Sequence, residues 1–444
     1  MSVNKNSPEF MEKLVSLCKR RGFIFQSSEI YGGINGFWDY GPYGAAMKKA
    51  IERLWWHEMV EKRQNVEGLD STIICHPRVW KASGHLDKFG DLMTDCRDCK
   101  ARHRVDQMED KTTCPGCGSK NLTPPREFNL MMKTYVGPVS DEEHVAYLRA
   151  ETCQPIFVDF DLVRVAARQT LPFGIAQIGK AFRNEINPRN FTFRSREFSQ
   201  MEMEFFCYEE SAMEWYEYWK NERIRYYRDV LKFGEDEIKI HDHDTLAHYA
   251  KAALDIEFKF PFGWGELEGV HHRGTWDLSR HQEFSGQSME YFDQENNRKV
   301  IPTVIETSVG VDRTMLAILC HAYDEDTAET KKEGMAEDAR LVLRLPPAVA
   351  PVQTAVLPLS KKLNEPAEKL FQDICRHFRS EFDVTGSIGK RYRRQDEIGT
   401  PFCLTFDFDT LNDQAVTVRH RDSMQQERVG ITQLRDYIEK VMYS

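Results

Sequence analysis

The fold of this chain is decided by residues 181–206, AFRNEINPRNFTFRSREFSQMEMEFF. The polar segment 187–190 contains Asn and Pro residues that favour a turn, and a strand-like stretch lies on each side of it. In the second stretch Gln200 and Glu202 share one face, whereas Met201 and Met203 share the other. The pattern predicts an antiparallel hairpin that brings one set of side chains within reach of a single ligand: Arg183, Glu185, Arg194, Arg196, Phe198 and Glu202.

The residue types on this hairpin suit a nucleotide. The planar guanidinium of Arg183 can hold phosphate oxygens through two parallel hydrogen bonds. The ring of Phe198 offers a flat face to a base, and the carboxylates of Glu185 and Glu202 can accept hydrogen bonds from amino groups. An ordinary sheet with a charged solvent face fits the same periodicity, so both interpretations stay open at this level.

Several separated segments resemble one enzyme family. Phe182-Arg183-Asn184-Glu185, a loop, and Arg194-Ser195-Arg196-Glu197-Phe198 are similar to motif 2 of the class II aminoacyl-tRNA synthetases. The match extends nearly end to end and is narrowed to the dimeric glycyl-tRNA synthetases by five segments in order: EIYGGINGFWDYGP at 29–42, LRAETCQPIF at 148–157, FSQMEMEFF at 198–206, FPFGWGELEG at 260–269 and ETSVGVDR at 306–313.

The resemblance implies a fold and an activity. The expected fold is α/β (α+β), with a class II catalytic domain built on an antiparallel sheet, a zinc-ribbon-like insertion and a C-terminal α/β anticodon-binding domain. The expected enzyme is a glycine–tRNA ligase that activates glycine with ATP to glycyl-adenylate and transfers the glycyl group to the 3′ end of tRNA(Gly). Glycine, ATP, tRNA(Gly) and a second copy of the chain are the implied partners.

The resemblance also implies site residues. Arg183, Glu185 and Arg313 are expected to be catalytic, and Glu266 is expected to hold Mg²⁺, which needs only one or two carboxylates besides the phosphates. The expected ATP-binding residues are Arg183, Asn184, Glu185, Phe193, Arg194, Ser195, Arg196, Glu197, Phe198, Glu266, Leu267, Gly310, Val311, Asp312 and Arg313. The expected glycine-binding residues are Arg102, Glu151, Phe198, Ser199, Gln200, Met201, Glu202, Glu306, Thr307, Ser308, Val309 and Gly310.

The segment around Glu151 departs from the family sequence, and Arg102 has a second interpretation. The family segment around Glu151 has alanine and glycine where this chain has Cys153 and Pro155. Arg102 matches a substrate-side arginine of the family, but an exposed, solvated arginine fits the sequence equally well. The histidines and aspartates at 241–244 are expected in a solvated loop rather than at a metal, because no further ligands stand at suitable spacing.

Four cysteines form two CxxC pairs, Cys96–Cys99 and Cys114–Cys117, separated by residues 100–113. Four thiolates at such spacing can close a tetrahedral zinc site, which is then structural because no ligand position is left for water. Redox pairing of the thiols is the alternative. The module that carries them is expected over residues 91–128, and the resemblance implies that it lies near the acceptor end of the tRNA.

Composition bounds the remaining possibilities. The chain has 444 residues, 41% of them hydrophobic and 29% charged, which is typical of soluble globular proteins of two or three domains. The net charge of −10 does not fit a general nucleic-acid coat, although local basic patches can still bind RNA. The apolar runs are too short to predict a membrane span. We expect a cytoplasmic protein, because the sequence has no signal-peptide pattern and its eleven cysteines are mostly scattered.

Periodicity predicts helices over 8–22, 43–63 and 211–233 and a strand over 66–77. The helix 43–63 and the strand after it resemble motif 1, which builds the dimer interface in this class. The apolar stripe of Leu54, Trp55, Trp56 and Met59 fits a partner surface and a core helix equally well.

A boundary is expected near residue 345. Residues 324–345 are acidic and read as a linker between a catalytic domain, 1–345, and an anticodon-binding domain, 346–444. Within the second domain a basic segment is expected to contact tRNA, with a solvated charged helix as the alternative: Lys390, Arg391, Tyr392, Arg393 and Arg394. Two other classes remain open: a synthetase-like adenylating protein that does not charge tRNA, and a zinc-ribbon RNA-binding protein.

Overall fold

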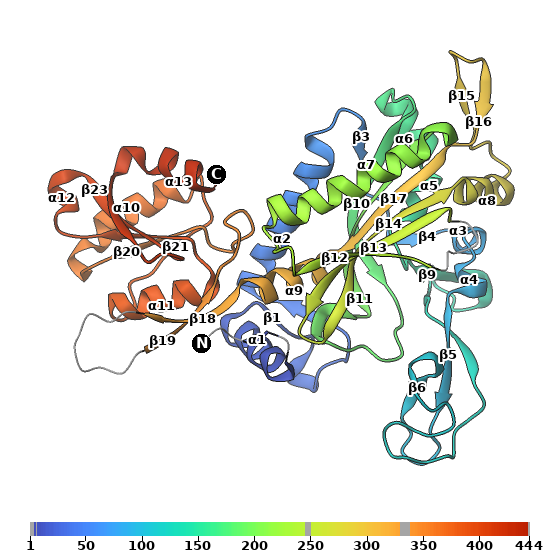
Figure 1. Ribbon diagram of the computed structural model, residues 1–444, viewed down its shortest axis with the longest axis horizontal. Coiled ribbons are helices and arrows are strands. Elements are labelled where there is room, and N and C mark those ends of the chain that lie inside the picture. Colours follow the sequence, from blue (N-terminus) through green and yellow to red (C-terminus); the bar gives the residue numbers. More distant parts are fainter. Residues whose placement is uncertain (1–3, 6, 245–249, 329–337, 443–444) are drawn as a thin grey trace.

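The protein has a large and a small lobe joined by a narrow connection (Figure 1). The computed structural model describes residues 4–5, 7–244, 250–328 and 338–442. The large lobe is built on a seven-stranded sheet and the small lobe on a five-stranded sheet. A three-stranded module projects from the large lobe, away from the connection (Figure 1).

The N-terminal segment confirms two predicted helices. Helix α1 spans Pro8–Arg21 and ends at Gly22, whose φ of 73° is the left-handed conformation that glycine adopts easily. Strands β1 (Ile24–Gln26) and β2 (Trp38–Tyr40) pair antiparallel before α2 (Pro42–Trp56), which continues into a π-helical turn. Trp55 and Met59 are fully buried in the core of the same chain, so the stripe on α2 serves mainly as a core face.

The large sheet has the strand order β12-β13-β14-β17-β11-β10-β3 and is antiparallel except between β10 and β3. Its strands are β3 (Val66–Gly68), β10 (Phe173–Phe182), β11 (Glu197–Cys207), β12 (Ile238–Asp242), β13 (Ala252–Phe260), β14 (Gly263–Gly274) and β17 (Thr303–Gly310). The predicted hairpin is confirmed, because β10 and β11 pair from Phe173–Phe206 to Phe182–Glu197.

The two faces of this sheet differ. Met201, Met203 and Phe205 pack into the main hydrophobic core together with helices α7 (Ala212–Arg225) and α9 (Val311–Ala322). The alternate residues of β11 point to the opposite side, where Phe198, Gln200 and Glu202 line a cavity. The sheet therefore separates the core from a polar site, as the alternation of side chains predicts.

Some elements differ from the prediction. Residues 66–77 do not form one strand: β3 joins the large sheet, whereas β4 (Ile74–Cys75) pairs with β9 (Val145–Leu148). Pro77 does not end a strand but begins α3 (Pro77–Ala82), where its missing N–H is not needed. The predicted helix over 211–233 is confirmed by α7 and a π-helical turn, and His241 and Asp242 lie on β12 rather than in a loop.

Several shorter helices and strands of the large lobe lie outside the seven-stranded sheet. They are α4 (His85–Lys88), β8 (Met132–Tyr135), α5 (Cys153–Val158), α6 (Phe160–Ala167), α8 (Trp276–Ser285), β15 (Tyr291–Asp293) and β16 (Arg298–Val300). The projecting module consists of β5 (Gly90–Asp95), β6 (Arg102–Arg104) and β7 (Arg126–Asn129), so it coincides closely with the predicted insertion over 91–128.

The predicted linker is partly a hairpin. Strands β18 (Tyr323–Ala328) and β19 (Asp338–Leu343) pair antiparallel, while the middle of the predicted linker, 329–337, lies outside the described residues. Leu343, Leu345 and Val352 belong to the main core of the large lobe. That core therefore continues beyond the predicted boundary at 345, because the connection carries apolar residues into it.

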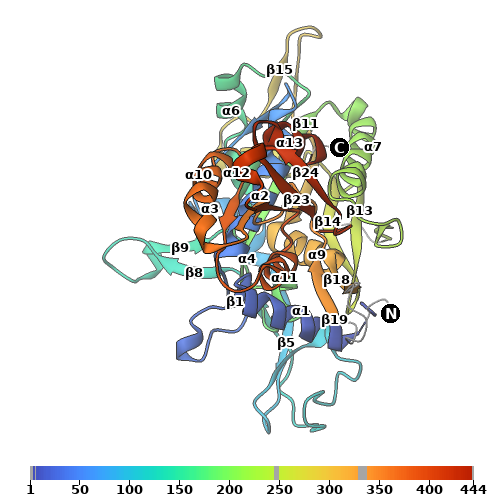
Figure 2. The same cartoon turned by 90° about the vertical axis from the view of Figure 1, so that its left-hand side faces the viewer.

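The small lobe contains the predicted alternation of strands and helices. Its sheet has the order β21-β20-β22-β23-β24. The elements are β20 (Thr354–Pro358), α10 (Asn364–Ile374), β21 (Ser380–Phe382), α11 (Ile388–Ile398), β22 (Phe402–Phe406), β23 (Ala415–His420), β24 (Gln426–Gly430) and α13 (Leu434–Met442). Helices α10 and α13 pack on one face of the sheet, and α11 packs on the other face, toward β18 and β19 (Figure 2).

Candidate active site

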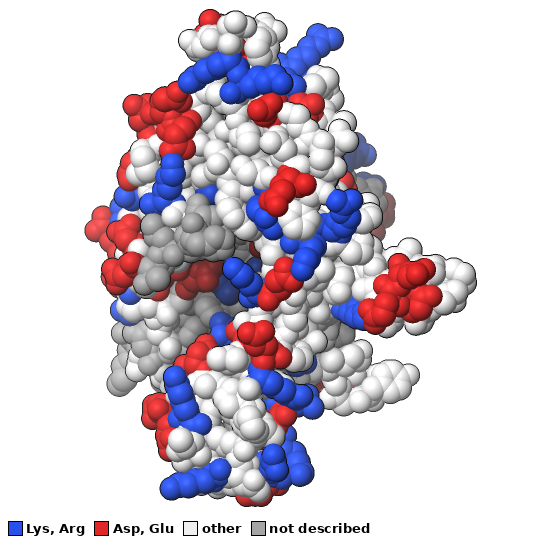
Figure 3. Space-filling view, turned by 90° about the vertical axis from the view of Figure 1, so that its right-hand side faces the viewer, with Lys and Arg blue, Asp and Glu red and all other residues white. Residues whose placement is uncertain are grey.

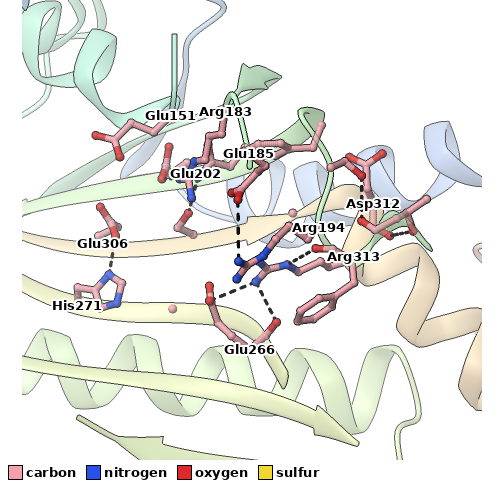
Figure 4. Close-up of a pocket in the computed structure, with 18 of the residues that line it drawn as sticks. Glu151, Arg183, Glu185, Arg194, Glu202, Glu266, His271, Glu306, Asp312 and Arg313 are labelled. Atoms are coloured by element: carbon pink, nitrogen blue, oxygen red, sulfur yellow. Dashed lines mark hydrogen bonds and ion pairs between the residues drawn. The ribbon is translucent and has the colours of Figure 1, made fainter. Parts of the chain in front are cut away.

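A cavity of ≈ 240 Å³ opens on the polar face of the large sheet (Figure 4). Strands β11, β14 and β17, the segment between β10 and β11, and the first turn of α9 provide most of its walls. Predicted site residues in the lining are Glu151, Arg183, Glu185, Phe193, Arg194, Ser195, Phe198, Gln200, Glu202, Glu266, Glu306, Ser308, Gly310, Asp312 and Arg313.

Arginine side chains occupy one part of the cavity. Arg183 Nε donates to the carbonyl oxygen of Ala150 at 3.1 Å, and its guanidinium lies 5.4 Å from the ring centre of Phe198. Arg194 approaches the carboxylate of Glu185 at 3.9 Å. One carboxylate oxygen of Glu185 is buried and has no hydrogen-bond partner among the described residues, so it can accept from a ligand.

Arg313 is placed by the start of α9. Its Nε donates to the carbonyl oxygen of Phe193 at 3.1 Å, and its guanidinium stacks over the Phe193 ring at 4.5 Å. A 3.2 Å ion pair joins it to Glu266. The positive charge of Arg313 lowers the pKa of Glu266, which keeps that carboxylate ionised beside the arginine-rich wall of the cavity.

Carboxylates gather at the other end of the cavity, where Figure 4 shows Glu151, Glu202 and Glu306. His271 Nδ1 lies 2.6 Å from one oxygen of Glu306, and Arg273 donates to the other at 2.5 Å. Burial opposes ionisation of Glu306, but these two partners outweigh it and lower its pKa to about 2. Burial and the neighbouring carboxylates raise the pKa of Glu202 to about 7, so this end of the cavity favours a bound cation.

Glu151 is also held as an anion. His85 lies 3.4 Å from its carboxylate, and Cys153 Sγ and Gln154 Nε2 donate to it at 3.0 and 3.1 Å. Burial opposes ionisation, but His85 and Arg273 dominate and hold the pKa of Glu151 well below its usual range. Cys153 therefore supports this glutamate even though the family segment has alanine there.

Other predicted residues do not line the cavity. Met201, Thr307 and Val309 alternate to the far side of their strands, and Leu267 and Val311 are buried in the core. The remaining residues outside the lining are Arg102, Asn184, Arg196, Glu197 and Ser199. The predicted sets are too broad because they include consecutive residues of each matching segment, whereas only alternate side chains of a strand face one side.

Several of these polar residues have other partners. Arg196 donates to the carbonyl oxygens of Asn35 and Glu185 at 2.8 and 3.0 Å, and Glu197 pairs with Lys180 at 2.8 Å. Arg102 lies in the projecting module, exposed and 3.4 Å from Asp95, as its alternative interpretation expected. These side chains stabilise the hairpin and the module instead of facing the cavity.

Four residues of the lining were missed: Thr192, Gly269, His271 and Arg273. Gly269, His271 and Arg273 are alternate residues of β14. A β-carbon at Gly269 would meet the His271 ring at 2.6 Å, so the glycine makes room for the imidazole. The strand period in GVHHRG was the signal that could have found them.

The four clustered cysteines meet in the projecting module. One Sγ from each lies within 4.8 Å of the others, and Cys96–Cys117 and Cys99–Cys114 are both 3.7 Å apart. A disulfide needs about 2.05 Å, and all eleven cysteines of the chain are free. Zinc–sulfur bonds of about 2.3 Å in a tetrahedron place the sulfurs about 3.8 Å apart, so the four thiols fit zinc.

The basic segment on α11 is largely engaged within its own lobe. Arg391 is buried and donates to the carbonyl oxygens of Pro358 and Asp383 at 2.8 and 3.0 Å. Tyr392 is half-buried and bonds Thr405, and Arg394 pairs with Asp383 at 2.6 Å. Burial keeps the Arg391 guanidinium away from the surface where tRNA contact was predicted, and its Nε has no hydrogen-bond partner among the described residues. Lys390 remains exposed.

The sequence of this chain matches two protein-family models and several known proteins. Residues 135–322 match the tRNA synthetase class II core domain (G, H, P, S and T), and residues 353–441 match the anticodon binding domain. A glycine–tRNA ligase of Treponema denticola is 52% identical over 96% of this chain and 95% of its own length. The chain belongs to the glycine–tRNA ligase family. Glycine–tRNA ligases of Acetivibrio thermocellus and Borreliella burgdorferi are 49% and 50% identical over 97% and 96% of this chain.

Family membership settles the class of the protein. It is an aminoacyl-tRNA synthetase with a class II core that binds ATP, and an enzyme that ligates glycine to tRNA. The family that the sequence resembles and the fold class expected from that resemblance are thereby confirmed. Within the described residues, no helix combines the length and apolarity needed to cross a membrane.

Proposed function

We propose that the cavity binds ATP and glycine side by side and that its lining residues carry the first step of the ligase reaction. The observation that carries this assignment is the polarity of the site, with arginines at one end and carboxylates at the other (Figure 4). The arginine end suits the triphosphate, and the carboxylate end suits the ammonium group of an amino acid. Arg183 lies between them, where the α-phosphate would meet the glycine carboxylate.

In the first step, a glycine carboxylate oxygen forms a bond to the α-phosphorus, and the bond from that phosphorus to the bridging oxygen breaks. The electron pair leaves with pyrophosphate. The carboxylate is already ionised at neutral pH, so no protein base is needed. In this assignment Arg183 neutralises charge on the reacting phosphate and Phe198 stacks on adenine, so catalysis consists of positioning and charge stabilisation.

In the second step, the oxygen of the terminal ribose hydroxyl of tRNA forms a bond to the glycyl carbonyl carbon, and the bond from that carbon to the phosphate oxygen breaks. The electron pair of that bond leaves with AMP, and the hydroxyl proton is released to water.

Glu266 would hold Mg²⁺ in the first step, and Arg313 would bind the distal phosphates. The Glu266 side chain is 51% exposed toward the cavity mouth and presents the hard oxygen ligands that Mg²⁺ prefers. When bound, Mg²⁺ supplies neutralising charge to the phosphates.

The test is ATP–pyrophosphate exchange with each of the twenty amino acids, followed by charging of tRNA. Exchange that depends on glycine, together with glycine charging, supports the assignment. Exchange without charging would favour a synthetase-like protein that forms an adenylate but does not charge tRNA. The absence of any amino-acid-dependent exchange would overturn the proposed binding of ATP and glycine in the cavity.

Ser308 is assigned to exclude larger amino acids. It lies two residues after Glu306 on the same side of β17, and its Oγ accepts from Gln200 Nε2 at 2.9 Å. Ser308→Gly should raise alanine-dependent relative to glycine-dependent exchange about tenfold, since accommodating a methyl is worth roughly 1–3 kcal/mol. Ser308→Ala keeps the β-carbon and is the matched control. An unchanged ratio in folded Ser308→Gly would assign exclusion elsewhere.

The cysteine cluster is assigned to structural zinc, supported by the sulfur separations in the projecting module. Cys96→Ser should reduce bound zinc from about one per chain to a small fraction of that, since one of four ligands is lost. Metal analysis after purification without chelator measures this. Cys375→Ser removes an exposed, unclustered thiol and is the control. Zinc-free wild-type protein would contradict the assignment.

Contacts with tRNA are assigned to both ends of the molecule. The small lobe, including exposed Lys390, would bind the anticodon, and the projecting module would lie near the acceptor end. Lys and Arg side chains surround the tip of this module, with acidic side chains between them (Figure 3).

A homodimer is proposed because the sequence resembles the dimeric glycyl-tRNA synthetases. The exposed side chains of Ile30 and Tyr31 offer apolar surface for this contact. The free cysteines suit a cytoplasmic location.

A further inference from the structure

Behind the carboxylate end of the cavity lies a fourth glutamate, Glu204, which does not line the cavity. Its side chain is fully buried, and neither carboxyl oxygen has a hydrogen-bond partner among the described residues. An isolated, buried carboxylate anion is very unfavourable, whereas a protonated carboxyl is much less so. An unpartnered buried group of this kind needs a physical explanation.

The neighbours of Glu204 are themselves acidic. In the antiparallel register Glu204 lies opposite Glu306, and Glu202 is on the same face of β11. A carboxyl oxygen of Glu204, one from each of these glutamates and the Sγ of Cys153 all lie within 4.8 Å of one another. Three carboxylates packed this closely would repel one another strongly if all were ionised.

The nearby cation does not resolve this repulsion. Arg273 already donates to Glu306 at 2.5 Å and to both carboxylate oxygens of Asp277, at 2.8 and 3.0 Å. Glu202 accepts from the backbone N–H of Thr152 and from Gln200 Nε2, which favours its charged form when a cation arrives. Burial and the charge of Glu306 raise the pKa of Glu204 well above its usual value. The charge of Arg273 opposes this rise but does not outweigh it, and Glu202 and Asp277 add to it.

We propose that Glu204 stays protonated throughout the reaction and is a positioning residue whose hydroxyl donates toward the carboxylates of Glu202 and Glu306. The donated hydrogen bond holds these carboxylates close together and facing the cavity. It also removes one negative charge from the cluster without a bound ion. This inference rests on the proposed binding of the glycine ammonium group at Glu202 and Glu306.

Two substitutions distinguish a protonated Glu204 that donates a hydrogen bond from an ionised Glu204. Glu204→Gln retains the shape and an N–H donor, so the KM for glycine should stay within about threefold of wild type. Glu204→Met is similar in size but cannot donate. It should raise the KM for glycine about tenfold, with kcat and the KM for ATP little changed, because a hydrogen bond to a charged group is lost.

Glu202→Gln is the matched comparison on the same face of β11. It should raise the KM for glycine about tenfold or more, because it removes a charge that faces the ammonium group. If Glu202→Gln has no effect, the ammonium site itself is misassigned. If Glu202→Gln acts as expected but Glu204→Gln raises the KM equally, Glu204 functions as an anion and the present inference alone is overturned.

The proton can also be observed directly. At about pH 9, where Glu202 with its pKa of about 7 is ionised, the infrared spectrum of the wild-type protein should still contain a carboxylic-acid C=O band that is missing in Glu204→Gln. Its absence from the wild type would overturn the inference. Metal analysis gives a further check: zinc and other divalent metals should be equal in wild type and Glu204→Gln, and loss of one metal per chain in the variant would show that the cluster binds a cation instead. Thermal unfolding confirms that each variant is folded.

Discussion

Arg183→Ala is expected to lower glycine-dependent ATP–pyrophosphate exchange by about 100-fold or more. The guanidinium lies between the arginine and carboxylate ends of the cavity, which are proposed to hold the triphosphate and glycine, so its removal should take away charge stabilisation that is strongest in the transition state. Loss of one such donor costs on the order of 10²–10³ in kcat in a comparable setting. Steady-state exchange with ATP and glycine varied separately measures the change in kcat.

Two further variants make this result specific. Arg183→Lys keeps the charge but loses the planar fork, so its exchange rate should lie between those of wild type and Arg183→Ala. Lys180→Ala removes a nearby cation near the end of β10. Lys180 pairs with Glu197 outside the cavity, so this variant should change the rate by no more than about twofold. Wild-type exchange in folded Arg183→Ala would refute the role of Arg183.

The second large effect is on stability. Asp312 was predicted to bind ATP, and it lines the cavity, but its carboxylate is engaged from inside the protein. Lys48 Nζ pairs with it at 2.9 Å, the backbone N–H of Ser199 donates to it at 2.6 Å, and the hydroxyl of Tyr40 also donates to it. Both charged side chains are buried. Lys48→Ala should therefore lower the free energy of unfolding by about 3–5 kcal/mol, because it leaves a buried charge without its counter-ion.

The pH dependence of this effect has a definite sign. Burial opposes ionisation of Asp312, but Lys48 together with the hydrogen bonds from Tyr40 and Ser199 outweighs it, so the pKa of Asp312 in the folded protein is lowered. A lowered pKa stabilises the folded protein above the unfolded-state pKa of about 3.9, and this stabilisation is lost as the pH falls through the folded-state value. In Lys48→Ala the buried carboxylate can be protonated at higher pH, so the stability gap to wild type should narrow as the pH falls toward about 4.

Urea unfolding of wild type and Lys48→Ala at several pH values measures both quantities. Lys49→Ala is the control on the same helix, because Lys49 is 82% exposed and its pair with Glu52 should contribute less than about 1 kcal/mol. Equal losses in Lys48→Ala and Lys49→Ala would contradict a buried ion pair. A pH-independent gap would show that the loss comes from packing rather than charge.

The sequence alone predicted the elements whose signals are local. The hairpin 181–206 and the helices on 8–22 and 43–63 follow from side-chain period and turn residues, which act within a few positions. The same period placed Gln200 and Glu202 on one face and Met201 on the other. The separate segments and the CxxC spacing also identified the family and the cysteine cluster before any contact was known.

Only the tertiary structure decided which side chains share the site. His271 meets Glu306 because β14 lies beside β17 in one register, and sequence period cannot specify which distant strands pair. For the same reason Lys48, far along the chain, reaches Asp312, and Arg391 is buried within its own lobe. Charged residues look alike in sequence whether they face water, a ligand or a counter-ion. What distinguishes them is burial and partner distance, and both depend on how remote segments pack.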